Sequence, residues 1–527
     1  MTAIGPWELR KPAIASAGGI VAGQSRRAAS AGAQILAAGG NAVDAAIATG
    51  FALGAVEPWM SGLGGCGYMV VQPPSGAAEV VDFGLLAPAA LDPARYELLP
   101  GGAGDQDNFG WPRVVQDRNV IGPDSAALPT YVEGIRLAHE RFGRLPWPAL
   151  LEPAVALAEE GILLDWYGAL AIAVAAPDLA LFEATRRLYL PGGLPPLPGN
   201  ATAPRYLPLP ALARTLRRLV SAGARDFYEG EIARRLAGEL KAAGSAISGA
   251  DLAGYRARIL PALDINYRGH RIAAVPGLSG GPALQQVLAG LGSRPAGGAA
   301  PGAGDYRAYA RMLRAAYAER LAKAGAGDRP AGPDGSARAS STSHLSAVDR
   351  DGMMVALTQT LLSRFGSKLL LPETGVLMNN GMMWFDPRPG HPNSIAPGKR
   401  PLANMCPVVV ARNGRPWLAL GASGGRSIMP ALAQILCFLI DHGMDLEAAF
   451  HQPRLDESGG GTVTIDARLG PEVAATVAAE GQSVEIGETR AYPVLFASPS
   501  AVLREGGRNL GMAEIASPWS GAVAEPG

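Results

Sequence analysis

Ser341-Thr342-Ser343-His344-Leu345-Ser346-Ala347-Val348-Asp349 is the stretch at which the character of the chain changes. The preceding run, 324–341, is rich in Gly, Ala, Pro and Ser and lacks apolar periodicity, which is typical of an exposed loop. After Thr342 the sequence is β-rich and continues through a turn at Asp351-Gly352 to the run 353–361. This pattern predicts a β-hairpin and places Thr342 where a loop meets the first strand of a sheet.

A threonine at that junction gains a chemical use if the chain is cut before it. Its hydroxyl is a poor nucleophile unless a base lies beside it, and a free α-amino group on the same residue is such a base. The pKa of an α-amino group is about 7.7–8.0, so a useful fraction is neutral near pH 7. The β-branch also restricts χ1 and helps to aim the oxygen. Taken locally, the sequence favours the plainer alternative that Thr342 merely begins a strand.

Other motifs reverse that preference. After the hairpin come Thr358-Gln359-Thr360, Phe365-Gly366-Ser367, Asn379-Asn380, Gly398-Lys399-Arg400-Pro401 and Gly421-Ala422-Ser423-Gly424-Gly425. Before it come Asn41-Ala42-Val43-Asp44-Ala45-Ala46, Glu57-Pro58 to Gly67, Phe227-Tyr228-Glu229-Gly230, Asp251-Leu252 to Tyr255, Tyr267-Arg268-Gly269 and Ser279-Gly280-Gly281. In this order they resemble the γ-glutamyltransferase (glutathione hydrolase) family, whose members are N-terminal nucleophile hydrolases made as proenzymes. The resemblance covers nearly the whole chain and points to a divergent, acylase-like or amidohydrolase-like branch.

The resemblance implies an α+β fold, the αββα sandwich, in which helices cover both outer faces of two antiparallel sheets. The large fragment, 1–341, would be helix-rich and end in the processing loop 324–341. The small fragment, 342–527, would carry the nucleophile and the central sheet. We expect the two fragments to stay associated as one intertwined catalytic unit, because neither carries a complete sheet. Periodicity alone predicts only a mixture of helix and strand.

Periodicity and capping residues predict the individual elements. The predicted helices are 25–38, 42–56, 131–141, 147–160, 164–175, 211–222, 229–243, 249–257, 280–291, 306–322 (capped by Asp305), 427–439 (amphipathic) and 470–479. The predicted strands are 68–71, 78–83, 369–378, 406–411, 417–422 and 493–503, with a hairpin at 265–275 and an irregular segment at 186–207. Helix 42–56 is apolar all round, so we expect Asp44 within it to have a structural partner.

Composition narrows the class of protein. Lys plus Arg and Asp plus Glu both number 46 among the 527 residues, which gives no electrostatic reason to expect a nucleic-acid or membrane partner. Cys66, Cys406 and Cys437 lie far apart and show no metal-ligand spacing. The segment 1–12 lacks the pattern of a signal peptide, and no apolar run is long enough to cross a bilayer. We therefore expect a cytoplasmic enzyme with a small-molecule amide substrate and neither cofactor nor metal, its oligomeric state left open.

The resemblance also implies roles for particular residues. Thr342 would be the nucleophile, and in the proenzyme its hydroxyl would attack the carbonyl of Ser341, shift the chain from amide to ester and release it by hydrolysis. Thr360 would orient the nucleophile. The backbone N–H groups of Gly424 and Gly425 would form the oxyanion hole, although a plain turn between strand and helix is the alternative for these glycines.

The substrate pocket departs from the family pattern. The family's Arg in Asp-Phe-Arg, its Asn after Thr-x-Thr-Leu, its Gln and Asp after Asn-Asn and its Ser-Ser pair are replaced by Gly84, Leu362, Gly381, Trp384 and Ala403-Asn404. Without those partners, burial of a zwitterionic γ-glutamyl head group would cost several kcal/mol. We therefore expect these residues, with Met383, to line a more apolar pocket for another acyl group, as in cephalosporin-acylase-like enzymes or oxamate amidohydrolase. Arg364 or Arg426 could receive a carboxylate from another direction.

Several alternatives remain. Genuine γ-glutamyl transfer and an inactive scaffold are the other functional hypotheses. Residues 421–425 also read Gly-x-Ser-x-Gly, as in an α/β-hydrolase elbow with Asp445 and His451, but no parallel βαβ series surrounds them. The Gly-x-Gly-x-x-Gly at 62–67 follows a predicted helix and precedes a strand, the reverse of a dinucleotide site. His344 is predicted to be structural.

Overall fold

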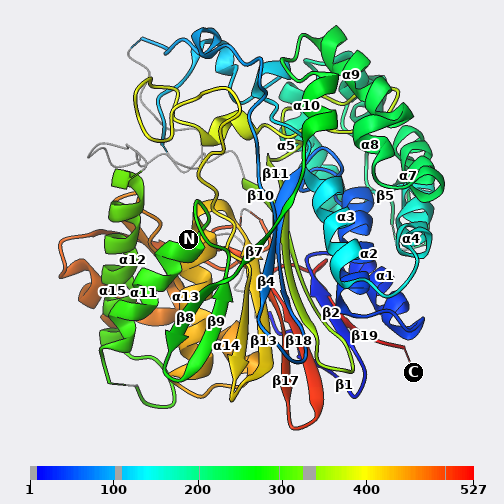
Figure 1. The fold of residues 1–527 in the computed structure, drawn as a ribbon. Coiled ribbons are helices and arrows are strands. Elements are labelled where there is room, and N and C mark those ends of the chain that lie inside the picture. Colours follow the sequence, from blue (N-terminus) through cyan, green and yellow to red (C-terminus); the bar gives the residue numbers. More distant parts are fainter. Residues whose placement is uncertain are drawn as a thin grey trace.

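Two seven-stranded sheets lie face to face at the centre of the computed structural model (Figure 1). It describes residues 9–100, 110–200, 202–295, 297–323, 340–492 and 494–526. Sheet 1 has the order β19 (Gly521–Ala524), β2 (Ile20–Gly23), β10 (Ser340–Val348), β11 (Met354–Ser363), β3 (Cys66–Gln72), β4 (Glu79–Phe83), β7 (Arg258–Pro261). Sheet 2 has the order β1 (Ile14–Ser16), β18 (Arg508–Ala513), β17 (Ser498–Glu505), β13 (Arg415–Ser423), β12 (Val408–Arg412), β9 (His270–Ala274), β8 (Leu263–Tyr267).

Helices cover the outer face of each sheet (Figure 1). On sheet 1 lie α1 (Arg26–Ala37), α2 (Ala42–Val56) and α3 (Tyr131–Phe142), backed by α4 (Trp147–Glu160) and α7 (Pro210–Ala222). On the side of sheet 2 lie α11 (Gly281–Gly292), α12 (Ala303–Lys323), α13 (Ile428–Ile440), α14 (Leu446–His451) and α15 (Gly470–Ala478). This arrangement confirms the predicted αββα sandwich.

Smaller elements complete the described part of the chain. They are α5 (Trp166–Leu179), α6 (Glu183–Tyr189), α8 (Asp226–Glu229), α9 (Glu231–Ala243), α10 (Gly249–Gly254), β5 (Ile162–Leu163), β6 (Tyr206–Leu207), β14 (Leu455–Asp456), β15 (Thr462–Asp466) and β16 (Ser483–Gly487). None of the described helices is both long and apolar enough to cross a membrane.

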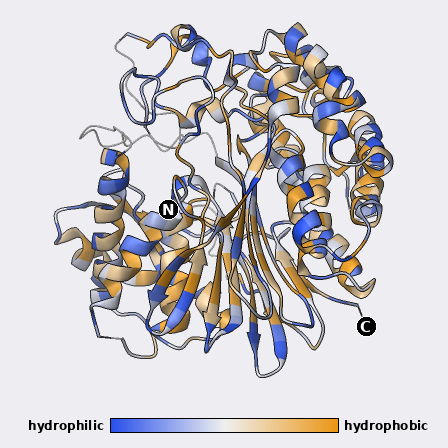
Figure 2. Ribbon diagram, in the orientation of Figure 1, coloured by the Kyte–Doolittle hydropathy of each residue, from blue (hydrophilic) through white to orange (hydrophobic). Residues whose placement is uncertain are grey.

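The alternation of side chains along the inner strands separates three apolar layers. On β11, Leu357 belongs to the layer between sheet 1 and its helices, whereas Ala356 belongs to the layer between the sheets. On β13, Leu420 packs with Leu432 of α13 in the third layer. The strands are mostly hydrophobic, as Figure 2 shows. Residues of β11 with even numbers, Thr360 among them, therefore face the space between the sheets.

The predicted hairpin is confirmed, but its start is not. β10 and β11 pair antiparallel around the turn that contains Gly352, and β10 begins at Ser340 rather than after the loop at Thr342. The strand extends that far because Ser340 and Ser341 find ladder partners in Ser363 and Leu362. The rest of the predicted processing loop, 324–339, lies outside the described residues.

Other boundaries and environments also differ from prediction. Segment 369–378 is a loop with two isolated bridges, Leu370 to Leu377 and Met378 to Gly64, because Pro372 and the left-handed Gly375 (φ 69°) interrupt a strand. Helix α13 is buried along almost its whole length rather than amphipathic, since it lies between sheet 2 and the outer helices. The segment predicted to be irregular, 186–207, contains the end of helix α6 and the whole of strand β6. Helix α12 begins at Ala303, so Asp305 lies in its first turn rather than at the cap.

Asp44 has the structural partners that its burial demands. It closes a capping box at the start of α2, where its carboxylate accepts hydrogen bonds from the backbone N–H groups of Asn41, Arg144 and Leu145 at 3.0–3.1 Å. The partners are amides rather than a cation, and they join α2 to the loop after α3.

Candidate active site

A β-bulge lies opposite Thr342, near the start of the inner strand β10. The ladder pairs Ser343 with Gln359 and Ser341 with Leu362, so Thr342 alone faces two residues of β11, Thr360 and Leu361. The extra residue thus belongs to β11, where a bulge bends the strand and changes the direction of its side chains; bulges are frequent beside active sites. Leu362 on the partner strand has φ 83°, a conformation rare for a β-strand side chain. The backbone opposite Thr342 therefore departs from regular β-strand geometry.

Thr342, Thr360 and the carbonyl of Ser341 form one hydrogen-bonded group. Thr342 Oγ1 lies 2.7 Å from the Ser341 carbonyl oxygen and 3.2 Å from Thr360 Oγ1. Thr360 Oγ1 also contacts the Ser341 oxygen, and it accepts a hydrogen bond from Leu362 N at 2.8 Å. Each hydroxyl has one proton and the carbonyl oxygen has none, so two of these three oxygen–oxygen contacts can be hydrogen bonds at once. In one such arrangement Thr342 donates to Thr360 and Thr360 donates to the carbonyl.

The loop after α2 forms hydrogen bonds with residues of β10 and β11 next to Thr342 and Thr360. The carbonyl of Met60 accepts hydrogen bonds from Leu361 N at 3.0 Å and from Ser341 Oγ at 3.4 Å. Ser61 Oγ lies 3.0 Å from Ser343 Oγ and accepts a hydrogen bond from Gln359 Nε2 at 2.9 Å. Sequence reasoning did not assign Met60 or Ser61 a role, although both fall inside the Glu57–Gly67 motif that carried part of the resemblance.

His344 is structural, as predicted. Its Nδ1 lies 2.8 Å from Thr358 Oγ1 and its Nε2 lies 3.0 Å from Ser346 Oγ, inside the space between the sheets. Burial lowers the pKa of His344 to about 3, so the ring is neutral at ordinary pH. Gly421 of sheet 2 faces this ring closely enough that a Cβ there would overlap it.

Gly421→Ala is therefore expected to destabilise the fold by about 1–3 kcal/mol, the usual cost of overpacking a core. The measurement is the free energy of unfolding from denaturant titration. Gly238→Ala is the matched control: its Cβ would meet nothing within 4 Å in helix α9, so stability should hold or rise. Equal stability of Gly421→Ala and the parent protein would contradict this account of the contact.

The α/β-hydrolase elbow is not assembled. Asp445 caps α14 by accepting a hydrogen bond from Ala448 N at 2.7 Å. His451 Nδ1 lies 2.8 Å from the Glu447 carbonyl, and its Nε2 accepts a hydrogen bond from Lys11 N at 3.2 Å. Neither residue is bonded to Ser423, so the motif at 421–425 lacks its acid and base.

Gly424 and Gly425 form the turn that follows β13, and this turn lies against β10. Their φ angles, 139° and 58°, favour glycine. A Cβ on Gly424 would lie 2.8 Å from Ala497 Cα, so the turn also packs too tightly for a side chain. Their assignment as oxyanion donors stays a prediction.

The predicted pocket residues divide into two groups. Leu362, Trp384 and Ala403 belong to the apolar layer between the sheets, together with Met383. Asn404, the residue after Ala403, is also buried, and its Nδ2 has no hydrogen-bond partner. Gly381 and Gly84 are positions where a side chain does not fit.

Neighbouring atoms fill the space that a side chain would need at both glycines. A Cβ on Gly381 would lie 2.6 Å from Ala127 Cβ, and a Cβ on Gly84 would overlap the hydroxyl of Tyr68. Arg400 donates to the Gly84 carbonyl at 3.0 Å and pairs with Asp82 at 3.4 Å. The arginine that the family carries at the position of Gly84 could enter here only if Tyr68 moved.

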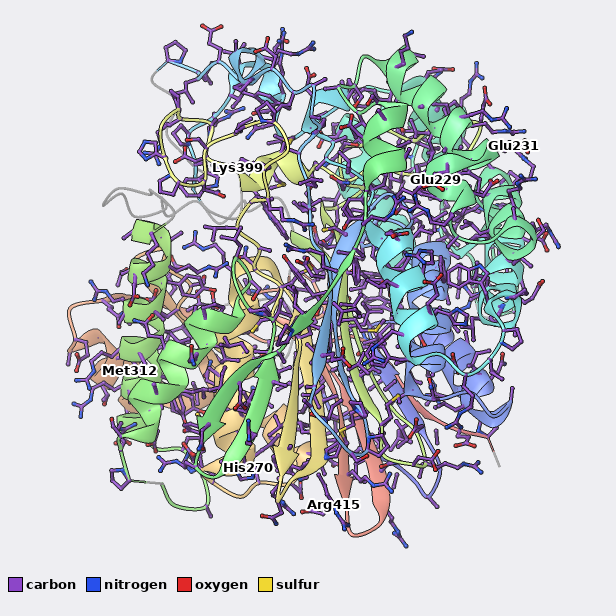
Figure 3. The ribbon with its side chains drawn as sticks, viewed as in Figure 1. Glu229, Glu231, His270, Met312, Lys399 and Arg415 are labelled. Atoms are coloured by element: carbon purple, nitrogen blue, oxygen red, sulfur yellow. The ribbon has the colours of Figure 1, made fainter. Side chains whose placement is uncertain are left out.

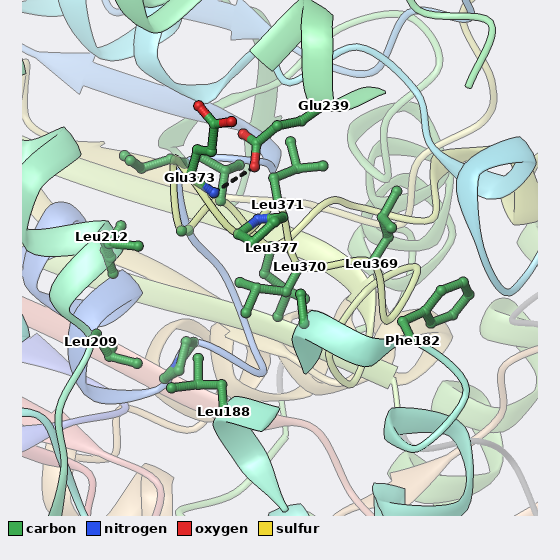
Figure 4. Close-up of a pocket in the computed structure, with 18 of the residues that line it drawn as sticks. Phe182, Leu188, Leu209, Leu212, Glu239, Leu369, Leu370, Leu371, Glu373 and Leu377 are labelled. Carbon is green, nitrogen blue, oxygen red and sulfur yellow. Dashed lines mark hydrogen bonds between the residues drawn. The ribbon is translucent and has the colours of Figure 1, made fainter. Parts of the chain in front are cut away.

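A cavity of about 910 Å³ lies on the other face of sheet 1 (Figure 4). Its lining includes Ser61, Leu361 and many leucines of α6, α7 and segment 369–377. Leu361 has an odd number and belongs to the helix-side layer, whereas Thr360 faces sheet 2. At the rim, Glu239 accepts a hydrogen bond from Glu373 N at 2.6 Å. This cavity is therefore not the space into which Thr342 faces.

The described residues include no cluster of three or more His, Cys, Asp or Glu that could hold a metal ion. All three cysteines are free and buried, and burial raises the pKa of each thiol, that of Cys406 to about 12. Figure 3 shows Arg415 and His270 at one end of the sandwich and Lys399 near the other. Since β13 runs from Arg415 to Ser423, the Gly424 turn lies at the end away from Arg415.

The two facing sheets with their helical layers define the chain as a protein of the N-terminal nucleophile hydrolase fold. The chain belongs to the gamma-glutamyltranspeptidase family, whose model matches residues 28–333 and 305–523. It is therefore an amidohydrolase or acyltransferase of that family.

Similar proteins include both acylases and glutathione hydrolases. The chain is 34% identical over 507 residues to the acylase ACY 1 proenzyme of Pseudomonas sp. (strain SE83), covering 90% of this chain and 88% of the relative. It is 31% identical over 493 residues to the glutathione hydrolase proenzyme of Pseudomonas sp. (strain A14), covering 84% and 82%. The crystal structure of cephalosporin acylase from Bacillus halodurans superposes with a TM-score of 0.85 at 23% identity, covering 100% of this chain and 99% of that one, a likeness of fold.

Proposed function

We propose that this chain is a self-processing amide hydrolase that uses Thr342 as its nucleophile and takes an acyl donor other than a standard γ-glutamyl group. The observation that carries the proposal is the contact of Thr342 Oγ1 with both Thr360 Oγ1 and the Ser341 carbonyl oxygen. A hydroxyl beside the preceding carbonyl, with a second hydroxyl bonded to both, has the parts that self-cleavage needs.

The cleavage step can be written from these contacts. Thr342 Oγ1 attacks the Ser341 carbonyl carbon and passes its proton to Thr360 Oγ1, while the Thr360 proton moves to the carbonyl oxygen. The resulting tetrahedral carbon expels the Thr342 nitrogen, which takes up the proton of the carbon's new hydroxyl group as the carbonyl re-forms, and an ester is left. Water then hydrolyses the ester to a Ser341 carboxylate and a Thr342 hydroxyl with a free α-amino group.

In turnover the freed α-amino group takes the hydroxyl proton as Thr342 attacks the substrate amide. The amine departs, an acyl-enzyme remains, and water or another amine releases the acyl group. Gly424 and Gly425 supply N–H groups to the oxyanion, a contribution worth about 10²–10³ in rate for one donor.

The interleaving of the strands supports two fragments that stay together. In sheet 1, β10 and β11 of the small fragment lie between β2 and β3 of the large one, and in sheet 2 the large fragment supplies β1 at one edge and β9 and β8 at the other. Cleavage before Thr342 would break one peptide bond but no ladder, so we expect residues 1–341 and 342–527 to remain associated.

The chemistry of the pocket favours an acyl group other than γ-glutamyl. The positions that hold its head group in typical members carry Leu362, Trp384 and Ala403 here, all in an apolar layer. γ-Glutamyl transfer remains the second candidate, because a glutathione hydrolase proenzyme is 31% identical over most of the chain.

A substrate panel on processed protein separates these two candidates. We expect glutaryl or oxamate-type amides to be hydrolysed with kcat/KM at least about tenfold above that of γ-glutamyl-p-nitroanilide, since removal of charge partners for the head group costs several kcal/mol. Faster turnover of the γ-glutamyl substrate would overturn the pocket argument. A single uncut chain without amidase activity would instead indicate the inactive scaffold.

A further inference from the structure

Arg364 is a cation without a counterpart at the end of the nucleophile's partner strand. Its Nε and Nη1 atoms are buried and have no hydrogen-bond partner. The guanidinium carbon lies over two aromatic rings, 6.0 Å from the centroid of Tyr167 and 5.6 Å from that of Tyr492. Among the residues that the structure describes, no carboxylate forms an ion pair with it. Unpaired buried donors of this kind are rare in proteins and suggest a missing partner.

Arg426, the other arginine that could receive a carboxylate, is already engaged. Its Nε donates to the Ser458 carbonyl at 2.6 Å, and its own carbonyl accepts a hydrogen bond from Tyr317. Its guanidinium thus serves to tie the turn after β13 to the segment at Ser458. The structure therefore distinguishes between two residues that the sequence left equivalent.

The surroundings of Arg364 place it at the same end of sheet 1 as Thr342. It follows Leu362, the ladder partner of Ser341, by two residues, and its neighbour Phe365 donates its N–H to the Trp59 carbonyl at 2.9 Å, next to the Met60 that supports the nucleophile. Thr360 precedes Arg364 by four residues, a distance of at most about 14 Å along an extended strand.

The rings beside Arg364 come from two separate parts of the chain. Tyr167 stacks on Trp519 at 3.7 Å between ring centroids, and Trp519 lies just before the edge strand β19 of sheet 1. Tyr492 lies in the segment that leads to Ala497, which packs against Gly424. Through Tyr492, Arg364 at the end of β11 thus contacts the segment that leads to the glycine turn.

We propose that Arg364 binds a carboxylate at the far end of the substrate's acyl group, so that the enzyme takes monoamides of short dicarboxylic acids. This inference rests on the proposed function. A carboxylate would satisfy the planar guanidinium with charge-assisted hydrogen bonds, and the two rings would shield the pair from water and strengthen it. None of the family's charged head-group positions is needed for such a substrate, which carries no α-amino group on its acyl chain.

The test compares two p-nitroanilides of equal carbon count, glutaryl and pentanoyl, which differ in the terminal carboxylate. Arg364→Met is expected to raise KM for the glutaryl substrate by about 10- to 100-fold, the usual effect of losing a charged hydrogen bond, and to leave the pentanoyl substrate unchanged. Arg364→Lys keeps the charge and should raise KM for the glutaryl substrate by a smaller factor. Arg490→Met is the matched control, because it removes an exposed arginine near Tyr492 and should change neither substrate.

A binding measurement keeps this inference separate from the proposed nucleophile. Calorimetry should show that glutarate binds the parent protein and that Arg364→Met lowers the affinity for glutarate by about 10-fold or more, whether or not the chain turns over an amide. Glutarate binding that is absent from the parent protein, or equal in the variant, would overturn the role of Arg364, as would equal losses for the glutaryl and pentanoyl substrates. A chain that stays uncut on a denaturing gel would instead count against Thr342. Two fragments in the Arg364 variants would show that they fold.

Discussion

Thr342→Ala is expected to run as one uncut chain on a denaturing gel and to lose amide hydrolysis by a factor on the order of 10⁶, as when a hydrolase loses its nucleophile. The substitution removes the oxygen that lies 2.7 Å from the Ser341 carbonyl oxygen, so neither self-cleavage nor formation of an acyl-enzyme can begin. Electrophoresis and intact-mass measurement give the state of the chain, and amide turnover gives the catalytic effect.

Two controls make that result specific. Thr342→Ser keeps the hydroxyl and should still be cut, although more slowly, because the less restricted χ1 aims the oxygen less well. Ser423→Ala should be cut like the parent protein, since Asp445 and His451 form no triad with Ser423. Active enzyme with the bond before Thr342 intact would refute the proposed catalyst.

Thr360→Val is expected to slow self-cleavage by about 10²–10⁴-fold, the usual contribution of a positioned proton-transfer group. Valine keeps the shape of the side chain but removes the hydroxyl that contacts both Thr342 Oγ1 and the Ser341 carbonyl. The proton of Thr342 then has no relay, and the carbonyl loses a donor. The rate is measured as the decay of the uncut chain with time.

Thr358→Val provides the matched control on the same face of β11. Its hydroxyl lies 2.8 Å from His344 Nδ1 rather than near the nucleophile. The loss of that partner should lower the free energy of unfolding by about 1–3 kcal/mol while cleavage continues. Equal slowing of cleavage in both variants would show that Thr360 acts through stability rather than through its hydroxyl.

The fold was accessible from the sequence because its signals are local. The turn at Asp351-Gly352 and the alternating residues around it predicted the hairpin, and the order of motifs predicted the sandwich. The prediction of a strand at 369–378 is wrong because its apolar residues resemble a strand, whereas Pro372 and Gly375 bend it into a loop. The prediction that α13 is amphipathic is wrong because its burial depends on two neighbouring layers that no local pattern reveals.

Less of the candidate site could be predicted from the sequence. Thr342 and Thr360 could be named from their motifs, and their contact follows from hairpin pairing. The support from Met60 and Ser61 could not be predicted, because these residues reach the nucleophile from more than 280 positions away in the chain. Tyr68 likewise explains Gly84 only through a steric contact in three dimensions.

The sequence by itself determined the family, the hairpin and the threonine near its start, since each depends on residue types at short, fixed spacings. The tertiary structure decided which groups surround that threonine, which glycines leave no room for a side chain, and which arginine is left without a partner. Those properties depend on distances between segments far apart in the chain, and only the packing of two sheets and their helices sets such distances.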